Sequence, residues 1–360
     1  MPAEQRLLLV GCGHSHLHLV KNVGRLVEAG YDVTLVGPAD FDYSGAASGI
    51  AIGVRPRAEG HIDVAALTHE RLTHVHDRVA AIDLAARTVR TDSGATLGWD
   101  VVSFNIGSVA RVPHGIPIDE TVVPVKPLSS LITLHDRLDR VPIGRGHRVT
   151  VIGAGPSGVE LAGHLAVHPH VDAVTLLDEG PVLAGLPDRA VRRVTTLLTE
   201  RGVALRCARL RAVGPDAVIL SDGARISHDL AVLATGLAPP LLASTGELGG
   251  HDGIPVRATL QHRDHDDVYA TGDCADFLPG SLARIGVHGV RQAPVLLTAL
   301  EARRRGGTAP TYRPPAQVLS ILDLGGGTAL AVRGRWWWLG RTSLWLKRRI
   351  DRKWIDTYRA

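Results

Sequence analysis

Short apolar runs, each followed by glycines and then by a helical pattern, occur twice in the chain. Residues 7–10 lead into "GCGHSHLHLV", and "RVTVIGAGPSGVELAGHLA" (148–166) repeats the arrangement. A continuous apolar run, a glycine turn and apolar positions three to four apart predict a buried strand, a tight turn and a helix. A second apolar strand follows each helix, as "YDVTLVG" and "AVTLLDEG".

The pattern after these strands is also duplicated. Each half continues with short alternating strands that turn at a Ser-Gly or Asp-Gly pair, at 93–94 and at 222–223. The halves then return as "DVVSFNIG", which ends at Gly107, and "DLAVLATG", which ends at Gly236. The same order at similar spacing predicts two homologous modules. We therefore predict an α/β fold with two Rossmann-like dinucleotide-binding domains.

The second glycine turn has the full context of a dinucleotide-binding fingerprint. Gly153, Gly155 and Gly158 stand between a strand and a helix, at the GxGxxG spacing. The first two allow the turn and the approach of a pyrophosphate, and the third lets the helix pack on the strand. Asp178 ends the next strand, about twenty residues on, where a carboxylate binds the ribose hydroxyls of an adenine dinucleotide. Glu179 is the fallback ligand.

The first glycine turn allows two interpretations. Cys12, His14 and His18 are residue types that bind metals, and His14 and His18 share a helix face. A metal there would occupy the place of a pyrophosphate, so we expect no metal. Instead we predict that Gly11 and Gly13 form the turn and that the backbone N–H groups of Gly13, His14 and Ser15 hold the pyrophosphate of a dinucleotide.

Composition restricts the class of protein. The 360 residues are 45% apolar and 21% charged, as in ordinary globular proteins, and the net charge of +4 suggests no nucleic-acid partner. The chain shows no signal peptide and no apolar run of the roughly 18 residues that a spanning helix needs. Three cysteines form no CxxC pair and suit a reducing compartment, so we expect a cytoplasmic location: Cys12, Cys207 and Cys274.

Residues 5–305 resemble the two-dinucleotide-binding-domain flavoproteins, the pyridine nucleotide-disulfide oxidoreductase superfamily. The resemblance rests on both fingerprints, on "LATG" and on "VYATGDCADF" (268–277). It implies FAD and NADH as cofactors, with Gly272 and Asp273 at the flavin's ribitol or phosphate end. It also implies a NAD(H)-binding domain (126–249) inserted into an FAD-binding domain (1–125 and 250–308), followed by a C-terminal α/β region (309–360).

Within the superfamily the chain looks most similar to type II NADH dehydrogenases, with features of a branch sometimes fused to selenophosphate synthetase. This resemblance implies roles for Glu160 near the nicotinamide, Gln292 near the flavin and His288 as a proton donor. Glu160 and Gln292 also have a plain interpretation, as polar residues near helix starts. Lys126 either contacts the cofactor or is a surface lysine. The first motif departs from the pattern, with His16 at its third glycine and Gly37-Pro38 where an acidic residue is expected.

The cysteines argue against two chemistries of this superfamily. Disulfide reductases need a close cysteine pair beside the flavin, and sulfide:quinone enzymes need two reactive cysteines. Cys12 and Cys274 are the two cysteines near the cofactor, and their motifs place them toward its phosphate and ribitol. We therefore expect neither activity.

Three functions remain open. The favoured one is an FAD-dependent oxidoreductase that takes hydride from NADH and passes electrons to a membrane quinone. The second is a soluble NAD(P)H-dependent reductase of a protein or small molecule, and the third is a regulatory flavoprotein with slow turnover. Asp178 favours NADH over NADPH, because its charge repels a 2′-phosphate and no arginine follows closely in the sequence.

The end of the chain differs in composition from the rest. Five of the six tryptophans fall there: Trp336, Trp337, Trp338, Trp345 and Trp354. From residue 342 the pattern predicts a helix with one apolar face and a basic remainder: Leu346, Ile350, Trp354 and Tyr358 against Lys347, Arg348, Arg349, Arg352 and Lys353. Such a helix suits an anionic membrane surface, here the inner face of the cell membrane. A helix closing the core, or a homodimer contact, is the alternative.

Overall fold

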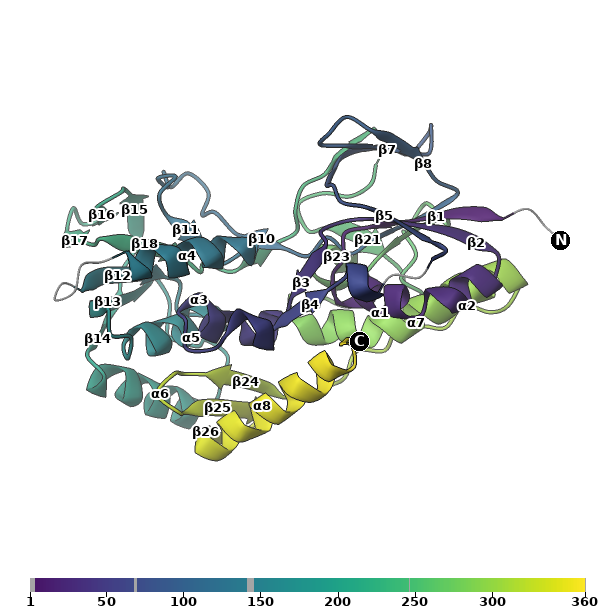
Figure 1. Ribbon diagram of the computed structural model, residues 1–360. Coiled ribbons are helices and arrows are strands. Elements are labelled where there is room, and N and C mark those ends of the chain that lie inside the picture. The colour runs from purple at the N-terminus through teal and green to yellow at the C-terminus, as the bar shows by residue number, and fades with distance from the viewer. Residues whose placement is uncertain (1–3, 68–69, 141–145, 246, 360) are drawn as a thin grey trace.

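The computed structural model describes residues 4–67, 70–140, 146–245 and 247–359. Two parallel sheets of five strands dominate it, one in each half of Figure 1. The first sheet has the order β22-β9-β1-β2-β5. Its strands are β1 (Gln5–Val10), β2 (Tyr31–Val36), β5 (Leu72–Val75), β9 (Val101–Phe104) and β22 (Val268–Ala270).

The second sheet repeats this topology in the order β11-β18-β12-β13-β14. In both sheets the strand before the glycine turn, β1 or β12, is central and pairs in parallel with the next strand in the repeat. The fold class predicted from the duplicated pattern is therefore confirmed. The strands are β11 (Val123–Pro124), β12 (His147–Ile152), β13 (Val171–Asp178), β14 (Val203–Cys207) and β18 (Leu230–Leu233).

Helices pack on these sheets through apolar positions three to four residues apart. The first sheet is accompanied by α1 (His14–Lys21), α2 (Val23–Glu28) and α7 (Gly286–Arg305), and α1 and α2 both contact α7. The second is accompanied by α4 (Ser129–Asp139), α5 (Pro156–Leu165) and α6 (Asp188–Glu200). In α6, Ala190, Val194 and Leu198 are four residues apart and fully buried, as an amphipathic helix requires. The short α3 (Ala47–Ala51) contacts α4 and α5.

The antiparallel excursions in both halves are also confirmed. The first comprises β6 (Val79–Asp83), β7 (Thr88–Thr91) and β8 (Thr96–Gly98), and the second β15 (Leu210–Val213), β16 (Ala217–Leu220) and β17 (Arg225–Ser227). Gly94 and Gly223 take positive φ angles of 91° and 87° at the turns, a conformation that glycine adopts without strain. Four smaller strands complete this part of the fold: β3 (Asp40–Asp42), β4 (His61–Asp63), β21 (Ile254–Val256) and β23 (Ala275–Phe277).

Strand pairing divides the chain slightly differently from the sequence motifs. β11 at 123–124 already belongs to the second sheet, although the sequence assigned it to the FAD-binding part. β20 (Ala243–Thr245) pairs with β6 beside the first sheet, before the expected return at residue 250. Between them, β10 (Val109–Ala110) pairs with β19 (Leu237–Ala238), so the two crossing segments run together. The sequence motifs mark the glycine turns and not the points where the chain crosses from one half to the other. This explains the difference in boundaries.

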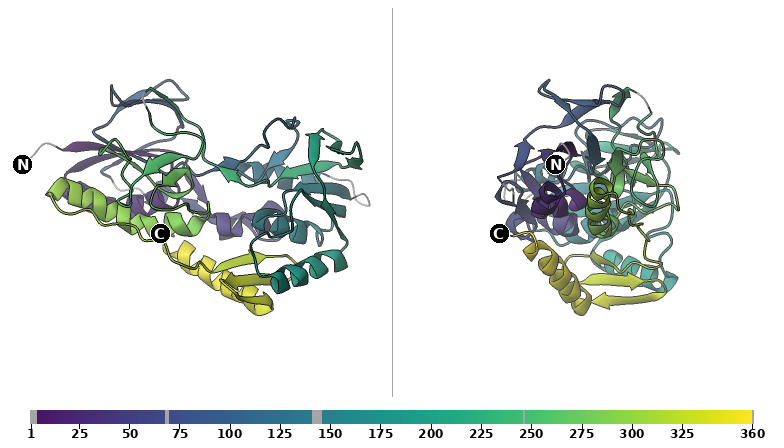
Figure 2. Two further views of the ribbon diagram at one scale, coloured as in Figure 1. Left: turned by 180° about the vertical axis from the view of Figure 1, so that it is seen from behind. Right: turned by 90° about the vertical axis from the view of Figure 1, so that its right-hand side faces the viewer.

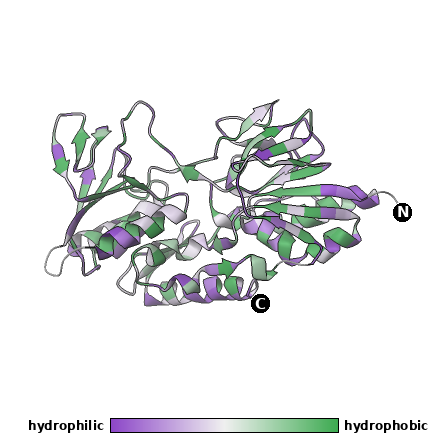
Figure 3. Cartoon of the chain, turned by 45° about the horizontal axis from the view of Figure 1, so that its top comes forward, coloured by the Kyte–Doolittle hydropathy of each residue, from purple (hydrophilic) through white to green (hydrophobic). Residues whose placement is uncertain are grey.

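The C-terminal region spans both halves of the molecule. Its hairpin sheet, β24 (Ser320–Asp323), β25 (Ala329–Arg333) and β26 (Trp336–Gly340), packs on α5 and α6. Helix α8 (Arg341–Asp356) then runs back from this hairpin toward the half that contains the first sheet, as Figures 1 and 2 show. Figure 3 shows hydrophilic and hydrophobic residues mixed along this helix. None of the helices in the described part of the chain is both long and apolar enough to cross a membrane.

The buried face of α8 differs from the predicted apolar face. Ile355 and Tyr358 are buried in the core around the first sheet, and Trp354 packs against that core. Ile350 is exposed, so the expected row of four apolar residues does not form one outward face. Leu322, Leu324, Leu330 and Val332 of the hairpin belong to the other core. The interpretation of this region as a helix that closes the core thus holds for part of its surface.

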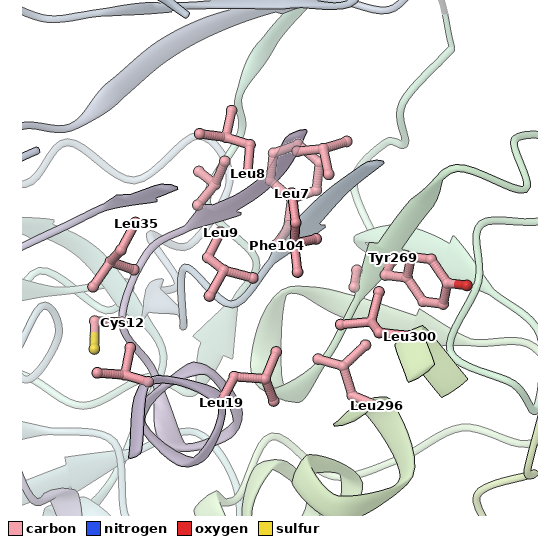
Figure 4. Packing of buried hydrophobic residues seen from close by; sticks show 14 of the residues in the cluster. Leu7, Leu8, Leu9, Cys12, Leu19, Leu35, Phe104, Tyr269, Leu296 and Leu300 are labelled. Carbon is pink, nitrogen blue, oxygen red and sulfur yellow. The ribbon is translucent and has the colours of Figure 1, made fainter. Parts of the chain in front are cut away.

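The core around the first sheet surrounds the first glycine turn. Figure 4 shows Leu35 near Cys12 on one side, Leu7 and Leu9 in the middle, and Leu296 and Leu300 of α7 on the other side. All of these side chains are buried, as the continuous apolar runs predicted. This packing places the end of β1 against the start of α1, where the candidate site begins.

Candidate active site

Two cavities meet at the junction of the three parts of the chain. The first, of about 470 Å³, has walls from both dinucleotide-binding halves and from the C-terminal region. The second, of about 1020 Å³, lies against the second glycine turn and the end of β13. The two cavities share five lining residues: Pro156, Ser157, Leu237, Arg284 and Ile285.

The second glycine turn has the geometry expected of its fingerprint. Gly153 takes a φ of +109°, and a Cβ there would lie 2.2 Å from the carbonyl oxygen of Ala234. A Cβ on Gly158 would lie 1.8 Å from the carbonyl oxygen of Gly153, so only glycine lets the helix approach the turn. Gly155 borders open space in the larger cavity, where backbone approaches a pyrophosphate.

Asn105, which the sequence reasoning missed, organises the first glycine turn. Its side-chain oxygen accepts hydrogen bonds from the backbone N–H groups of Ser15 (2.9 Å) and His16 (3.2 Å), and its carbonyl oxygen accepts one from Gly13 (3.0 Å). Its side-chain nitrogen donates to the Thr271 carbonyl at 2.8 Å. The asparagine at the end of β9 in "FNIG" was the available signal, since polar residues at the carboxyl ends of parallel strands line sites.

These contacts correct the assignment of the first turn. The N–H groups of Gly13 and Ser15 already donate to Asn105, and the Ser15 hydroxyl donates to the Gly289 carbonyl at 2.7 Å. Ser15 therefore joins α1 to α7. Of the three N–H groups assigned to a pyrophosphate, that of His14 is the one for which the described residues provide no acceptor.

His16 replaces the third glycine by making hydrogen bonds of its own. Its Nδ1 lies 2.6 Å from the Gly11 carbonyl oxygen and its Nε2 lies 2.8 Å from the Ser103 hydroxyl. Burial lowers its pKa to about 4, although the Gly11 carbonyl opposes this shift. The neutral ring thus ties the turn to the sheet where Gly158 makes a close backbone contact in the other half.

The three histidines of "GHSHLH" face different surroundings. The His14 ring lies among Phe41, Tyr43 and Trp354 and lines the smaller cavity. Burial and the nearby Lys126 lower its pKa to about 3. His18 lies 3.4 Å from the Tyr358 hydroxyl. Within the described residues no group of three or more histidines, cysteines, aspartates or glutamates is arranged to hold a metal.

Asp273 and Lys126 bring opposite charges to the smaller cavity. The Asp273 carboxylate accepts a hydrogen bond from the Ser108 hydroxyl at 2.7 Å, just after Gly107. Burial lowers the pKa of Lys126, and Asp273 opposes the shift. Gln292, buried on α7, accepts a hydrogen bond from the Gly272 N–H at 2.7 Å and so supports the turn that carries Asp273.

Glu160 stands where the NAD-binding half meets the C-terminal region. Its carboxylate accepts hydrogen bonds from the Asp323 N–H at 2.7 Å and the Ser48 hydroxyl at 3.2 Å, and it lines the smaller cavity. Burial raises its pKa, and the Lys347 ammonium of α8 opposes the rise. Because α5 begins at Pro156, Glu160 lies beyond the first helical turn, so the helix-dipole interpretation loses its basis.

His288 is not among the described residues that line the smaller cavity. Its Nδ1 lies 2.8 Å from the Tyr312 hydroxyl, and its neighbours Val287 and Val290 line the cavity instead. Burial lowers its pKa. These contacts give no support to its prediction as a proton donor.

Asp178 lies in the larger cavity, with an arginine that the sequence argument overlooked. Its oxygens accept hydrogen bonds from the N–H groups of Ala154 (2.6 Å) and Gly180 (2.8 Å). Glu179 beside it pairs with Arg209 at 3.3 Å, and both line the cavity. Arg209 is distant in sequence and comes close because β14 pairs with β13.

The buried cysteines are unsuited to thiolate chemistry. Burial raises the pKa of Cys12 to about 12 and that of Cys274 to about 11. Neither lines either cavity, whereas Cys207 is exposed. The expectation against sulfide and disulfide chemistry therefore gains a physical reason, because the thiolate is the reactive form.

The residues of the smaller cavity fit FAD. The start of α1 provides a helix N-terminus, Asp273 an acceptor for ribitol hydroxyls, and Lys126 a positive charge. Gly286 leaves room beside His14, since a Cβ there would lie 3.2 Å from its ring. Two dinucleotide-binding halves whose cavities meet define a flavoprotein that draws electrons from a nicotinamide coenzyme.

The chain belongs to the pyridine nucleotide-disulphide oxidoreductase family, whose model matches residues 5–299. The resemblance drawn from the sequence is thus confirmed, and FAD and a nicotinamide coenzyme, NAD(P)H, are the cofactors. His14 at the start of α1 and Asp273 would hold FAD, and the turn at Gly155 would hold the nicotinamide coenzyme.

Several known proteins are similar to the chain. The mitochondrial internal alternative NAD(P)H-ubiquinone oxidoreductase A1 of Solanum tuberosum is 35% identical over 141 residues, which cover 36% of this chain and 28% of that protein. The chain therefore matches little more than a quarter of that relative's length. The structure of NDH2 from Plasmodium falciparum in complex with NADH has a TM-score of 0.81 at 12% identity, covering 99% of this chain and 97% of that one. The sulfide:quinone oxidoreductase of Aquifex aeolicus has a TM-score of 0.80 at 16% identity, covering 99% and 91%.

Proposed function

We propose that the protein is an NADH:quinone oxidoreductase that works at the inner face of the cell membrane. The observation that carries this proposal is the set of residues shared by the two cavities. Pro156 and Ser157 at the start of α5 line both, so a coenzyme held at Gly155 has its reactive end beside the flavin cavity. The residues of the smaller cavity would hold FAD, which would supply hydride acceptance and one- or two-electron transfer.

The chain's own residues mainly position the reactants and exclude water. Gly153 and Gly158 bring α5 close to the turn, and the apolar side chains of Leu237 and Ile285 line both cavities. In the overall reaction, NADH, one proton and the quinone are converted to NAD⁺ and the quinol.

The C-terminal region forms the wall where an acceptor would enter. Val318 and Leu319 just before the hairpin, Ile321 of β24 and Ile350 of α8 line the smaller cavity. Leu319 and Ile350 are also exposed, so apolar surface continues from the cavity to the outside. An apolar quinone ring suits such a lining, in which few polar groups fix its orientation.

Glu160 is the proton donor that this geometry favours. Burial raises its pKa, so its neutral form persists to higher pH than that of an ordinary glutamate. It borders the cavity at the contact between α5 and the C-terminal wall. Gln292 takes a positioning role in this proposal, through Gly272.

Exposed aromatic and basic residues support a membrane contact. Trp336, Trp338 and Trp345 are 84%, 63% and 62% exposed, which is unusual for tryptophan. The exposed side of α8 adds a row of cations: Arg341, Arg348, Arg349, Arg352 and Lys353. Tryptophan and basic side chains are the types that settle at a bilayer interface.

Turnover and vesicle binding together test this proposal. We expect NADH oxidation with a short-chain quinone analogue, and flotation of the protein with anionic vesicles that weakens as salt is raised. The triple variant Trp336→Ser, Trp338→Ser, Trp345→Ser should stay in solution yet reduce a water-soluble acceptor normally. Trp99 is buried and is therefore unsuitable as a control position. The control variant is Trp337→Phe. Flotation by the triple variant equal to wild type would contradict the membrane contact.

A soluble electron carrier is the second candidate acceptor. The cations of α8 border a cavity of about 970 Å³ with Asp356 as its one acidic lining residue among those described. An acidic carrier protein would be attracted to such a surface. Salt-sensitive turnover with an acidic carrier and none with quinone would favour this candidate.

A further inference from the structure

The ends of β13 and β14 place an arginine beside the adenosine end of the coenzyme cavity. Asp178 and Cys207 are opposite each other in the strand pairing, and Arg209 follows two residues later. The Ala208 N–H donates to the Asp178 carbonyl at 2.9 Å, which holds the two strand ends together. Arg209 therefore lies beside the carboxylates despite its distance in sequence.

The carboxylates of Asp178 and Glu179 differ in how firmly they are held in place. Both oxygens of Asp178 accept backbone hydrogen bonds, from Ala154 and Gly180, so this carboxylate is held against the glycine turn. The Glu179–Arg209 pair is 67% and 76% exposed at its side chains. Surface ion pairs of this kind are weak and exchange partners readily.

We propose that Arg209 is a specificity-determining residue that lets the coenzyme site accept NADPH as well as NADH. The inference rests on the proposed function, since it concerns the coenzyme of the same site. NADPH differs from NADH by a phosphate on the adenosine ribose, and that ribose is the group expected at Asp178. Arg209 exchanges Glu179 for this 2′-phosphate when NADPH binds.

The chemistry of both groups suits the exchange. A guanidinium binds phosphate through two parallel hydrogen bonds, with more charge on the phosphate than on a single carboxylate. Glu179 can turn to solvent when released because it is mostly exposed. Arg111, which lines the same cavity, adds a second positive charge.

Asp178 limits the exchange and leaves NADH as a coenzyme. Its negative charge remains next to the ribose and opposes a 2′-phosphate, although two N–H groups partly offset it. The carboxylate binds the hydroxyls of NADH, whereas Arg209 serves the phosphate of NADPH. The site can use both NADH and NADPH because Asp178 and Arg209 line the same cavity.

Titrations of both coenzymes into the FAD-loaded protein test this assignment. Affinity is measured by isothermal titration calorimetry with the oxidised coenzymes NAD⁺ and NADP⁺, so turnover is not required. Arg209→Ala should weaken NADP⁺ binding roughly tenfold or more, with NAD⁺ binding changed less than about twofold. The matched control is Arg206→Ala, which removes an exposed arginine of β14 that lines neither cavity. Glu179→Gln, which frees Arg209, should strengthen NADP⁺ binding.

The outcomes separate this inference from the proposed function. Loss of NADP⁺ binding in Arg209→Ala alone, with a gain in Glu179→Gln, supports the exchange. Equal effects of Arg209→Ala on both coenzymes, or no NADP⁺ binding by a wild type that binds NAD⁺, overturn the assignment of Arg209 while leaving the proposed function intact. If the wild type binds neither coenzyme, the proposed function fails, and this inference fails with it.

Discussion

Asn105 connects segments that are far apart in sequence. It accepts hydrogen bonds from Ser15 and His16 at the start of α1 and donates one to Thr271, just before the turn that carries Asp273. Both segments belong to the part of the site that fits FAD. A single side chain therefore sets the spacing between the two turns that the sequence motifs identified separately.

Replacing Asn105 should reduce FAD binding and stability together. Asn105→Ala leaves two buried N–H groups and one carbonyl without partners, at a cost of about 1–3 kcal/mol for each buried group. We expect a lower FAD content on purification and a lower midpoint of thermal unfolding. Asn105→Asp keeps the acceptor and loses the donor. Its FAD content and unfolding midpoint should lie between those of the wild type and Asn105→Ala. Full FAD content in Asn105→Ala would contradict this role.

Thiol labelling tests the environment of the three cysteines. Burial holds the pKa of Cys12 and Cys274 far above neutral pH, whereas Cys207 is exposed. Alkylation of the native protein should add one group, at Cys207, and leave the oxidation of NADH unchanged. Mass spectrometry counts the groups, and Cys207→Ser is the control that should take up none. Rapid labelling of Cys274 would reopen a thiol mechanism.

The C-terminal region shows what a helical pattern can and cannot predict. The sequence identified the helix and its concentration of tryptophan, but it placed Trp354 and Tyr358 on the same exposed face as Ile350. In the fold Trp354 stacks on Tyr43 with ring centres 4.7 Å apart, and Tyr358 is buried. Periodicity identifies the residues that share a face. It does not say whether that face meets a membrane or the protein's own core.

Removal of α8 should therefore destabilise the FAD-binding half. Deleting residues 341–360 exposes the surface under Ile355 and Tyr358, each worth about 1.5–3 kcal/mol of burial. We expect a lower unfolding midpoint and loss of FAD. The control is the triple tryptophan variant, whose changed side chains are exposed and whose midpoint should match wild type. An unchanged midpoint after truncation would show that α8 does not close this core.

At the scale of the whole molecule, duplication made the fold predictable. Apolar runs and glycine turns identified both sheets, because parallel strands buried on both faces leave a strong pattern. Asn105 left a signal, as a polar residue at the end of a predicted strand, but its partners depend on the pairing of β9 with β1. Arg209 and Lys347 were not predictable as site residues, because each reaches its place through strand pairing or through the packing of α8, and such contacts leave no local signal. His16 was visible as a departure, but its hydrogen bonds to Gly11 and Ser103 required the fold.

Stability should fall in acid because buried histidines are neutral in the folded protein. Burial lowers the pKa of His16 to about 4 and that of His14 to about 3, whereas both titrate near 6.5 when unfolded. The stability they provide is complete above pH 6.5 and is lost as pH falls toward these folded values, by about 1.4 kcal/mol per pH unit and group. Denaturant unfolding between about pH 7.5 and 5 should show this slope, and His16→Gln should make it shallower. A slope unchanged in His16→Gln would contradict the assignment.

The most direct test of the central claim is anaerobic stopped-flow absorbance of the FAD-loaded protein. NADH should bleach the visible absorbance of the flavin, and a quinone analogue mixed in afterwards should restore it within the turnover time. Asp178→Ala should slow the bleaching at low NADH concentration and leave the recovery unchanged, because it acts at the coenzyme cavity alone. Flavin that NADH fails to bleach, or that bleaches but is not reoxidised by quinone, would contradict the account.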